Sequence, residues 1–245
     1  MLKMKSMKMK PLLFCAFFAS FLVGCKDPVI VPKDEDGVFQ DSRDLHVYKY
    51  ITLANQVWMA ENLAYLPSVF SPTSGDANLT RYYVYGYEGD TTEVARAKSN
   101  YATYGVLYNW VAALSACPAG WHLPTDTEFT ALTDSLINKG FGFDGSGSDI
   151  AKSMASTSGW DSFLIRGTPG NDQALNNESG FSAPPGGYRG GDGKFIYIGN
   201  LANYWTASED GPTTAWSRHL YFGNDGVMRY SFHRSSGFSI RCVRD

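Results

Sequence analysis

The fold of this chain is decided by the stretch Trp110-Val-Ala-Ala-Leu-Ser-Ala-Cys117-Pro-Ala-Gly-Trp-His-Leu-Pro-Thr-Asp-Thr-Glu128-Phe129, which is matched near the C-terminus by Phe238-Ser-Ile-Arg-Cys242-Val-Arg-Asp245. Each stretch sets one cysteine among aromatic and aliphatic residues. Two cysteines so far apart in sequence suggest a domain whose ends are joined. A redox-active or metal-binding pair of thiols is the alternative.

Two helices are predicted around the first stretch. In residues 105–116, apolar side chains recur at the spacing of one helix face, at Leu107, Trp110, Val111 and Leu114. A proline and a glycine follow this segment and are expected to end the helix.

The second helix has a clear start signal. Thr125 is expected to cap the helix, and Glu128 three residues later completes a capping box with it. Pro124 and Phe129 stand at the two positions of a hydrophobic staple. The face expected to be buried carries Phe129, Leu132 and Leu136. Glu128 therefore has a structural role in this interpretation rather than a catalytic one.

Short β-strands are predicted for much of the remaining chain. Residues 47–53 and 56–63 are β-prone and flank Ala54-Asn55, the pattern of a hairpin. After a short helix expected at 149–155, β-like runs lie at residues 181–189, 195–198, 204–208, 216–222, 227–232 and 238–243. The Gly-Asn-Asp-Gly of residues 223–226 is typical of a hairpin turn. Helices together with antiparallel strands indicate an α+β fold, with two main helices and long loops.

The segment between residues 67 and 100 has no clear periodicity. It carries a cluster of tyrosines, at Tyr82, Tyr83, Tyr85 and Tyr87. A surface insertion with packed tyrosines is the simpler interpretation, and an aromatic platform for a sugar or a peptide is the alternative.

The composition excludes some classes of function. The 245 residues are 44% hydrophobic and 15% aromatic but only 18% charged, with 25 glycines and 15 tyrosines. This mixture is typical of a loop-rich surface domain rather than a helical cytoplasmic enzyme. The formal net charge is −3, so no nucleic-acid partner is expected.

The N-terminus predicts export. Four lysines among the first ten residues precede an apolar run at 12–23, which is too short to span a bilayer in the mature protein. The run ends in Leu22-Val23-Gly24-Cys25, which resembles the lipobox of bacterial lipoproteins. Residues 1–24 are therefore predicted to be a lipoprotein signal peptide. Cys25 is the predicted site of lipid attachment, and Cys15 is removed with the signal.

The predicted anchor and tether define the location. Removal of residues 1–24 leaves 17 basic and 24 acidic residues, a net charge of −7. Such a surface disfavours a basic-patch contact with anionic lipids, so membrane attachment is expected through the N-terminal lipid. Residues 25–44 are charged and turn-rich and are predicted to be a flexible tether. Lys26-Asp27 resembles signals that send lipoproteins to the surface of the bacterial outer membrane; its periplasmic face is the alternative.

Motifs spread over residues 45–245 resemble one protein family. They include Asn55-Gln-Val-Trp-Met-Ala-Glu-Asn-Leu63, Cys117-Pro-Ala-Gly-Trp-His-Leu-Pro124, Gly180-Phe-Ser-Ala-Pro-Pro-Gly-Gly-Tyr-Arg189, Tyr204-Trp-Thr-Ala-Ser-Glu209 and Gly237-Phe-Ser-Ile-Arg-Cys-Val-Arg244. In this order they resemble the Fibrobacter succinogenes major paralogous domain, which occurs in secreted and lipid-anchored bacterial surface proteins. More distantly, the chain resembles the C-type lectin-like fold and the related formylglycine-generating sulfatase-modifying factors.

The resemblance implies a disulfide. In the C-type lectin-like fold, the cysteine at the first helix pairs with the cysteine of the last strand, here Cys117 with Cys242. This agrees with an exported protein that keeps two thiols. The bond would stabilise the domain by about 5 kcal/mol in the chain-entropy model.

The fold resemblance also places a ligand site in the loops between the helices and the last strands, within residues 160–216. The residues that we expect to supply stacking and hydrogen bonds are Tyr188, Arg189, Trp205, Glu209 and Trp216. The alternative is that these side chains only pack the loops.

No metal or cofactor is expected. The four histidines are dispersed without metal-ligand spacing. The acidic and serine-rich loop at 144–149 lacks the glycine position and the terminal glutamate of an EF-hand. His122, between Trp121 and Leu123, is expected to be a core residue.

Three functions remain open. The first is a non-catalytic binding or adhesion module for a glycan or a surface protein. The second is a structural subunit of a surface appendage or envelope assembly. The third, an enzyme of the formylglycine-generating type, conflicts with the disulfide, because that chemistry needs reactive thiols. We expect that the protein is not an enzyme.

Overall fold

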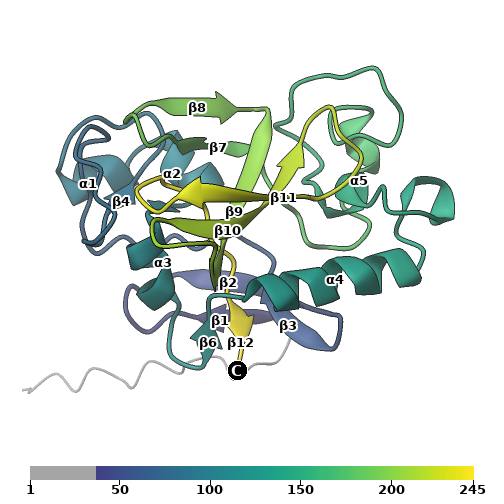
Figure 1. The fold of residues 1–245 in the computed structure, drawn as a ribbon, viewed down its shortest axis with the longest axis horizontal. Helices are drawn as coiled ribbons and strands as arrows, with labels where there is room; N and C mark the ends of the chain where they lie inside the picture. The colour runs from purple at the N-terminus through teal and green to yellow at the C-terminus, as the bar shows by residue number, and fades with distance from the viewer. Residues whose placement is uncertain (1–36) are drawn as a thin grey trace, which may run out of the picture. The chain divides into compact units, whose positions relative to one another are not determined.

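The computed structural model describes residues 37–245 and contains two five-stranded sheets (Figure 1). The predicted signal peptide, Cys25 and most of the predicted tether lie outside the described residues. Helices and strands both contribute to the domain, so the α+β prediction is confirmed. Among residues 37–245, every helix is too short or too polar to cross a membrane.

The first sheet has the strand order β1-β2-β3-β12-β6, and its paired strands are antiparallel. Its strands are β1 (Val38–Gln40), β2 (Val47–Leu53), β3 (Gln56–Met59), β12 (Val243–Arg244) and β6 (Trp121–His122). The second sheet has the order β11-β10-β9-β7-β8, and its one parallel pair is β7 with β9. Its strands are β11 (Met228–His233), β10 (Thr214–Tyr221), β9 (Leu201–Glu209), β7 (Gly186–Arg189) and β8 (Phe195–Ile198). A two-stranded sheet joins β4 (Tyr82–Tyr83) to β5 (Leu107–Tyr108).

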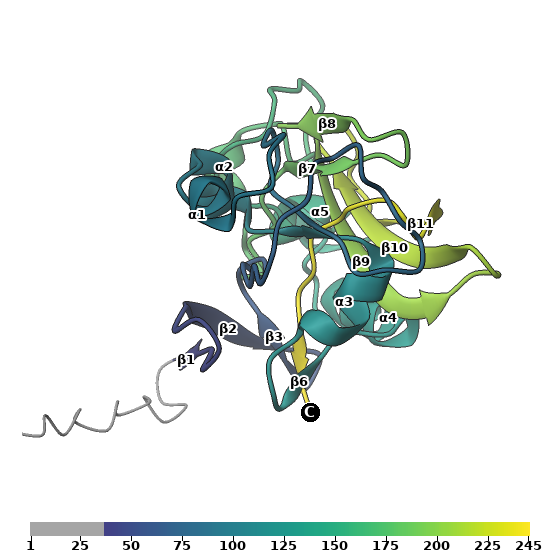
Figure 2. The ribbon, with the colours of Figure 1, turned by 90° about the vertical axis from the view of Figure 1, so that its left-hand side faces the viewer.

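The helices are short apart from one. They are α1 (Thr92–Arg96), α2 (Ser99–Tyr104), α3 (Trp110–Ala116), α4 (Asp126–Asn138) and α5 (Ala151–Met154), with single 3₁₀ turns at Phe143–Gly145 and Gln173–Leu175. In both views the first sheet lies at the bottom of the domain and the second sheet above it (Figures 1 and 2).

The predicted hairpin at the start of the domain is confirmed. β2 and β3 pair antiparallel, with Leu53 opposite Gln56. Ala54 and Asn55 form the turn with φ of 53° and 60°, the left-handed conformation that a tight two-residue hairpin loop requires. The sheet starts earlier than expected, because β1 pairs with β2 although it lies in the segment 25–44 predicted as tether. Phe39 of β1 is buried and stacks on Tyr48 and Trp121, and this packing explains why β1 belongs to the folded domain.

The second predicted helix is confirmed as α4 together with its capping box. The Glu128 amide donates to the Thr125 hydroxyl at 3.2 Å, and the Thr125 amide donates to the Glu128 carboxylate at 2.7 Å. Phe129 is fully buried and reaches both large sheets. Its ring centroid lies 5.1 Å from Trp58 of β3 and 6.3 Å from Tyr204 of β9. The helix therefore anchors the two sheets to each other through one aromatic contact region.

The first predicted helix is wrong in its start and in its buried face. α3 begins at Trp110, and Asn109 caps it by accepting a hydrogen bond from the Ala112 amide. Leu107 is instead in β5, opposite Tyr83. Leu114 is exposed, and the buried helix residues are Trp110, Ala112, Ala113 and Ala116. Trp110 is on the buried face as predicted, but the other buried positions are alanines, whose small side chains allow the helix to approach its neighbours closely.

Two further helices, α1 and α2, lie in or beside the segment that we expected to be irregular. They bury a single residue between them, Ala95, so they carry no apolar periodicity that a sequence could reveal. The expected short helix at 149–155 is confirmed as α5. The last predicted strand, 238–243, is shorter than expected: Phe238 and Ser239 make isolated bridges, and only Val243 and Arg244 form β12.

The predicted disulfide is confirmed. Cys117, directly after α3, is bonded to Cys242, directly before β12, with their Cα atoms 5.9 Å apart. The bond closes a sequence separation of 125 residues. It therefore ties the helical part of the domain to the C-terminal strand of the first sheet.

Candidate functional site

Two of the predicted ligand-binding residues are buried parts of the framework. Arg189 is almost fully buried, and its guanidinium donates to the carbonyls of Pro72 and Ser235, each at 2.8 Å. Trp205 is fully buried, donates from Nε1 to the Tyr108 carbonyl at 2.9 Å and stacks on a neighbouring phenylalanine. Neither side chain reaches the surface, so the structure gives no support to the prediction that these two residues bind a ligand.

Two other predicted residues, Glu209 and Trp216, make separate contacts with different side chains. Glu209 pairs with Arg234 at 3.1 Å on the surface. Trp216 is half-buried, and the guanidinium carbon of Arg229 lies 3.2 Å above its ring centroid. Trp216 also faces the α4 side of β10, since its neighbour at i+2, Arg218, is bonded to Asp126 of α4. The five predicted residues therefore do not form one site.

The fifth residue, Tyr188, lies in a hollow of about 330 Å³ on the other face of the second sheet. We call this hollow the aromatic basin. Its lining residues come from all five strands or their ends: Tyr188, Tyr197, Leu201, His219, Tyr221, Met228, Tyr230 and Phe232. Its volume lies at the lower end of the range for small-ligand sites. In Figure 2 the strands that carry it lie at the upper right of the domain.

Strand alternation builds the basin. On β10, His219 and Tyr221 point to the same face, and the register places His219 opposite Met228 of β11. The β11 residues at i+2 and i+4 from Met228 are Tyr230 and Phe232, so one face of this strand is apolar and aromatic throughout. Tyr230 and Tyr197 leave about half of their surface exposed, at 49% and 52%. Rings that rest on a sheet and remain open to solvent form a contact surface without any movement.

The rings support one another. The centroid of His219 lies 5.2 Å from that of Phe232 in a stacked arrangement and 5.3 Å from that of Tyr230. Tyr188 lies 5.9 Å from Tyr197 and 6.0 Å from Phe232. Such pairs stabilise one another beyond simple burial, so the basin is held in shape before a ligand arrives.

The basin is uncharged. Burial lowers the pKa of His219 to about 3, so its imidazole is neutral at physiological pH. Its Nε2 lies 2.9 Å from the Ser217 hydroxyl. Burial also raises the pKa of the Tyr188 phenol, which therefore stays protonated. The basin offers aromatic faces, hydroxyls and a neutral imidazole to whatever binds there.

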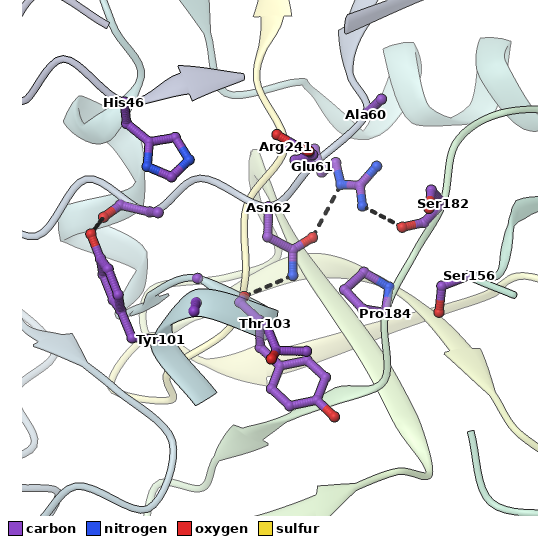
Figure 3. Close-up of a pocket in the computed structure, with 14 residues that line it drawn as sticks. His46, Ala60, Glu61, Asn62, Tyr101, Thr103, Ser156, Ser182, Pro184 and Arg241 are labelled. Atoms are coloured by element: carbon purple, nitrogen blue, oxygen red, sulfur yellow. Dashed lines mark hydrogen bonds between the residues drawn. The ribbon is translucent and has the colours of Figure 1, made fainter. Parts of the chain in front are cut away.

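A second hollow, of about 250 Å³, is more polar and lies between α2 and the loop around Pro184 (Figure 3). Arg241 at its base is fully buried and donates to Asn62 Oδ1 at 3.1 Å and to the Ser182 carbonyl at 2.9 Å. Asn62 in turn donates to the Tyr104 carbonyl. These polar groups already hydrogen-bond to one another and to loop carbonyls. The hollow therefore serves to hold loops together rather than to bind a ligand.

A third hollow, of about 310 Å³, lies beside the loop at 140–145. The one buried cation that lines it, Lys152, donates to the carbonyls of Asn171 and Asp172 and to the side chain of Asn176. Its ammonium group is therefore saturated. Within the described part of the chain, no group of three or more His, Cys, Asp and Glu residues is placed to hold a metal ion.

His122 differs from the prediction that it is a core residue. Its Nδ1 lies 2.6 Å from an Asp245 carboxylate oxygen, and its Nε2 lies 2.9 Å from one of Glu128. Partial burial alone would lower the pKa of His122, but the hydrogen bonds and the charges of the two carboxylates outweigh it and raise the pKa. The His122 imidazole thus links Asp245 to the cap of α4.

The tyrosines of residues 82–87 mostly serve packing. Tyr83 is fully buried under Arg189, and Tyr87 is nearly so. The sequence signal for the aromatic basin was instead the alternation His219-x-Tyr221 and Met228-x-Tyr230-x-Phe232 across a hairpin turn. Without the register, these residues could not be assigned to one face with Tyr188 and Tyr197.

The fold and the basin together define a disulfide-closed α+β domain with an aromatic sheet face. Residues 51–244 match the model of the Fibrobacter succinogenes major domain, and the chain belongs to this family. No curated protein and no solved structure matches the chain.

Proposed function

We propose that this protein is a cell-envelope lipoprotein that acts as a non-catalytic binding module, with the aromatic basin as its contact surface. The observation that carries the proposal is the half-exposed pair Tyr197 and Tyr230 on an uncharged and largely aromatic face. Exposed aromatic side chains on a preformed surface are typical of binding sites for glycans and proteins.

The N-terminal sequence supports the location. A lipid on Cys25 would hold the module at the bacterial outer membrane, either surface-exposed or on the periplasmic face, and residues that follow would act as a tether. The Cys117–Cys242 disulfide is consistent with an oxidising compartment outside the cytoplasm. Replacement of Cys25 by serine should move the protein from the membrane fraction to the soluble fraction of cells. Retention in the membrane would contradict the anchor.

The finer fold assignment, a C-type lectin-like fold, belongs to the same proposal. It is supported by the bond between a cysteine at the end of α3 and a cysteine next to the last strand. This bond also argues against a formylglycine-generating enzyme, because both thiols are bonded to each other. A thiol assay under non-reducing conditions should detect no reactive Cys117 or Cys242, and labelling of either would reopen the enzymatic hypothesis.

One observation favours the alternative of a structural subunit. Leu164 is 94% exposed and Ile165 is 58% exposed at the tip of a loop. The tip is held in place, since Asn171 donates to the Phe163 carbonyl and the Thr168 hydroxyl donates to the Ile165 carbonyl. An ordered apolar tip of this kind suits a protein–protein contact.

The two functions can be separated with matched variants of the exported protein. Tyr230→Ala removes a basin ring that contributes about 1 kcal/mol to a stacked contact. It should therefore weaken ligand binding roughly fivefold in a screen of glycans and surface proteins. Leu164→Ala is the control and should leave that binding unchanged. The opposite result, with crosslinking on intact cells lost in Leu164→Ala and binding unaffected in Tyr230→Ala, would favour the structural subunit.

A further inference from the structure

Asn203 is a buried amide without a partner. It lies in β9 between Leu201 and Trp205 and directly opposite His219 of β10. Because side chains at i and i+2 share a face, it is on the basin side of the sheet with Leu201, which lines the basin. The residue is 1% exposed, and neither its Nδ2 nor its Oδ1 has a hydrogen-bond partner among residues 37–245.

Such an amide is costly for the fold. A buried donor and acceptor that have left water and found no partner destabilise the folded state, and a leucine of similar size would not. Buried polar groups that stay unsatisfied in native proteins call for a water molecule, an ion or a function as their explanation. The place of Asn203, directly behind the basin wall, points to a function in binding.

Tyr197 is a second costly feature of the same surface. It has φ of 64°, a left-handed conformation that is unfavourable for a bulky side chain. It lies across from Gly187, between the register pairs Gly186 with Ile198 and Tyr188 with Ile196. A Cβ on Gly187 would lie 2.5 Å from the Ile196 carbonyl oxygen, so β7 needs a glycine at the position across from Tyr197. The strained backbone holds the Tyr197 ring half-exposed over the basin, and strain of this kind concentrates at functional sites.

The chemistry of the lining narrows the class of ligand. Within residues 37–245, the side chains that line the basin include no Asp, Glu, Lys or Arg. A charged ligand would lose its water there and gain no opposite charge. The surface instead combines flat aromatic rings and phenol hydroxyls, and the unsatisfied Asn203 amide lies buried on the same face of the sheet. A pyranose ring matches this set, because it has an apolar C–H face and hydroxyls that both donate and accept.

We propose that the aromatic basin binds an uncharged pyranose glycan, which stacks on the exposed rings of Tyr197 and Tyr230 as they stand and shares a hydrogen bond with the Asn203 amide once the side chains that bury this amide have moved. This inference rests on the proposed binding function and names its ligand class. It makes Asn203 and Tyr197 positions where the fold gives up stability for binding.

The test uses Asn203→Leu and Tyr197→Asn in the exported full-length protein. The probes are soluble neutral glucans, xylans and mannans, with the acidic polysaccharides alginate and polygalacturonate as comparison. We expect binding of at least one neutral polysaccharide and none of the acidic ones. Asn203→Leu should weaken that binding on the order of tenfold while its melting temperature stays equal or rises. Tyr197→Asn should behave likewise, because asparagine tolerates φ above zero and cannot stack.

Leu164→Ala, outside the basin, serves as the control for binding, and it should bind as the parent protein does. Unchanged binding in Asn203→Leu, a lower melting temperature in that variant, or equal binding of acidic polysaccharides would each overturn the inference. If no polysaccharide binds but Tyr230→Ala removes binding to a surface protein, the glycan inference fails and the proposed binding function stands. If basin variants change binding to no ligand at all, both fail.

Discussion

The disulfide offers the sharpest test of the fold, and its removal has a calculable effect. Cys117 and Cys242 close a loop with a sequence separation of 125 residues. In the chain-entropy model, opening such a loop gives the unfolded state about 5 kcal/mol of additional conformational freedom at 25 °C. For a domain of this size, a loss of 1 kcal/mol lowers the melting temperature by about 2–4 °C. Removal of the bond should therefore lower the melting temperature by roughly 10–20 °C.

The assay is thermal unfolding followed by circular dichroism, with and without a thiol reductant, on the parent protein and on a Cys117→Ala/Cys242→Ala variant. Reductant should lower the melting temperature of the parent protein toward that of the double variant. The double variant itself should not respond to reductant, which controls for other effects of the reagent. A parent protein whose melting temperature falls by less than a few degrees would refute the role of the bond as the link between the ends of the domain.

Four further predictions follow from individual contacts. Trp205→Ala should destabilise the domain by about 3–5 kcal/mol in urea unfolding, because its fully buried ring leaves a cavity; a small effect would contradict its framework role. Thr125→Ala should cost about 1 kcal/mol through loss of the α4 cap, measured in the same way, and an unchanged midpoint would contradict the capping box. Because the folded-state pKa of His122 is raised, its stabilisation is fully present below the unfolded value of about 6.5 and is lost as the pH rises through the folded value. A His122→Gln variant should therefore show a flatter stability profile above pH 6, and an identical profile would contradict the link to Asp245. Arg189→Met should lower stability without a specific effect on ligand binding, and a selective loss of binding would restore Arg189 as a site residue.

Local signals made part of the fold predictable. The capping box of Thr125 and Glu128 lies within one helical turn, and the Ala54-Asn55 turn joins strands that are neighbours in sequence. Both depend on contacts over a few residues, which a sequence contains in full. The start of α3 depends on something else, the pairing of Leu107 with Tyr83 from a distant segment. Because of that long-range pairing, Leu107 lies in a strand although its spacing from the next apolar residues is helical.

The site was harder to predict than the fold. Residue type suggested Arg189 and Trp205, but only tertiary packing shows that both are buried beneath other loops. Tyr188 was among the residues that the fold resemblance pointed to, whereas the other lining residues of the basin come from β8, β9, β10 and β11. The unsatisfied amide of Asn203 has no sequence signature, because whether a buried amide finds a partner depends on the tertiary packing around it.

Hydroxyl-radical footprinting of the exported protein tests the central claim, that the aromatic basin is the binding surface, most directly. The protein would be oxidised alone and in the presence of the neutral polysaccharide that binds best, and modified side chains would be mapped by mass spectrometry. We predict protection of the half-exposed rings Tyr197 and Tyr230, with Leu164 modified equally in both samples. Protection of Leu164, or of residues around the hollow of Figure 3, with no change at either tyrosine would contradict the account.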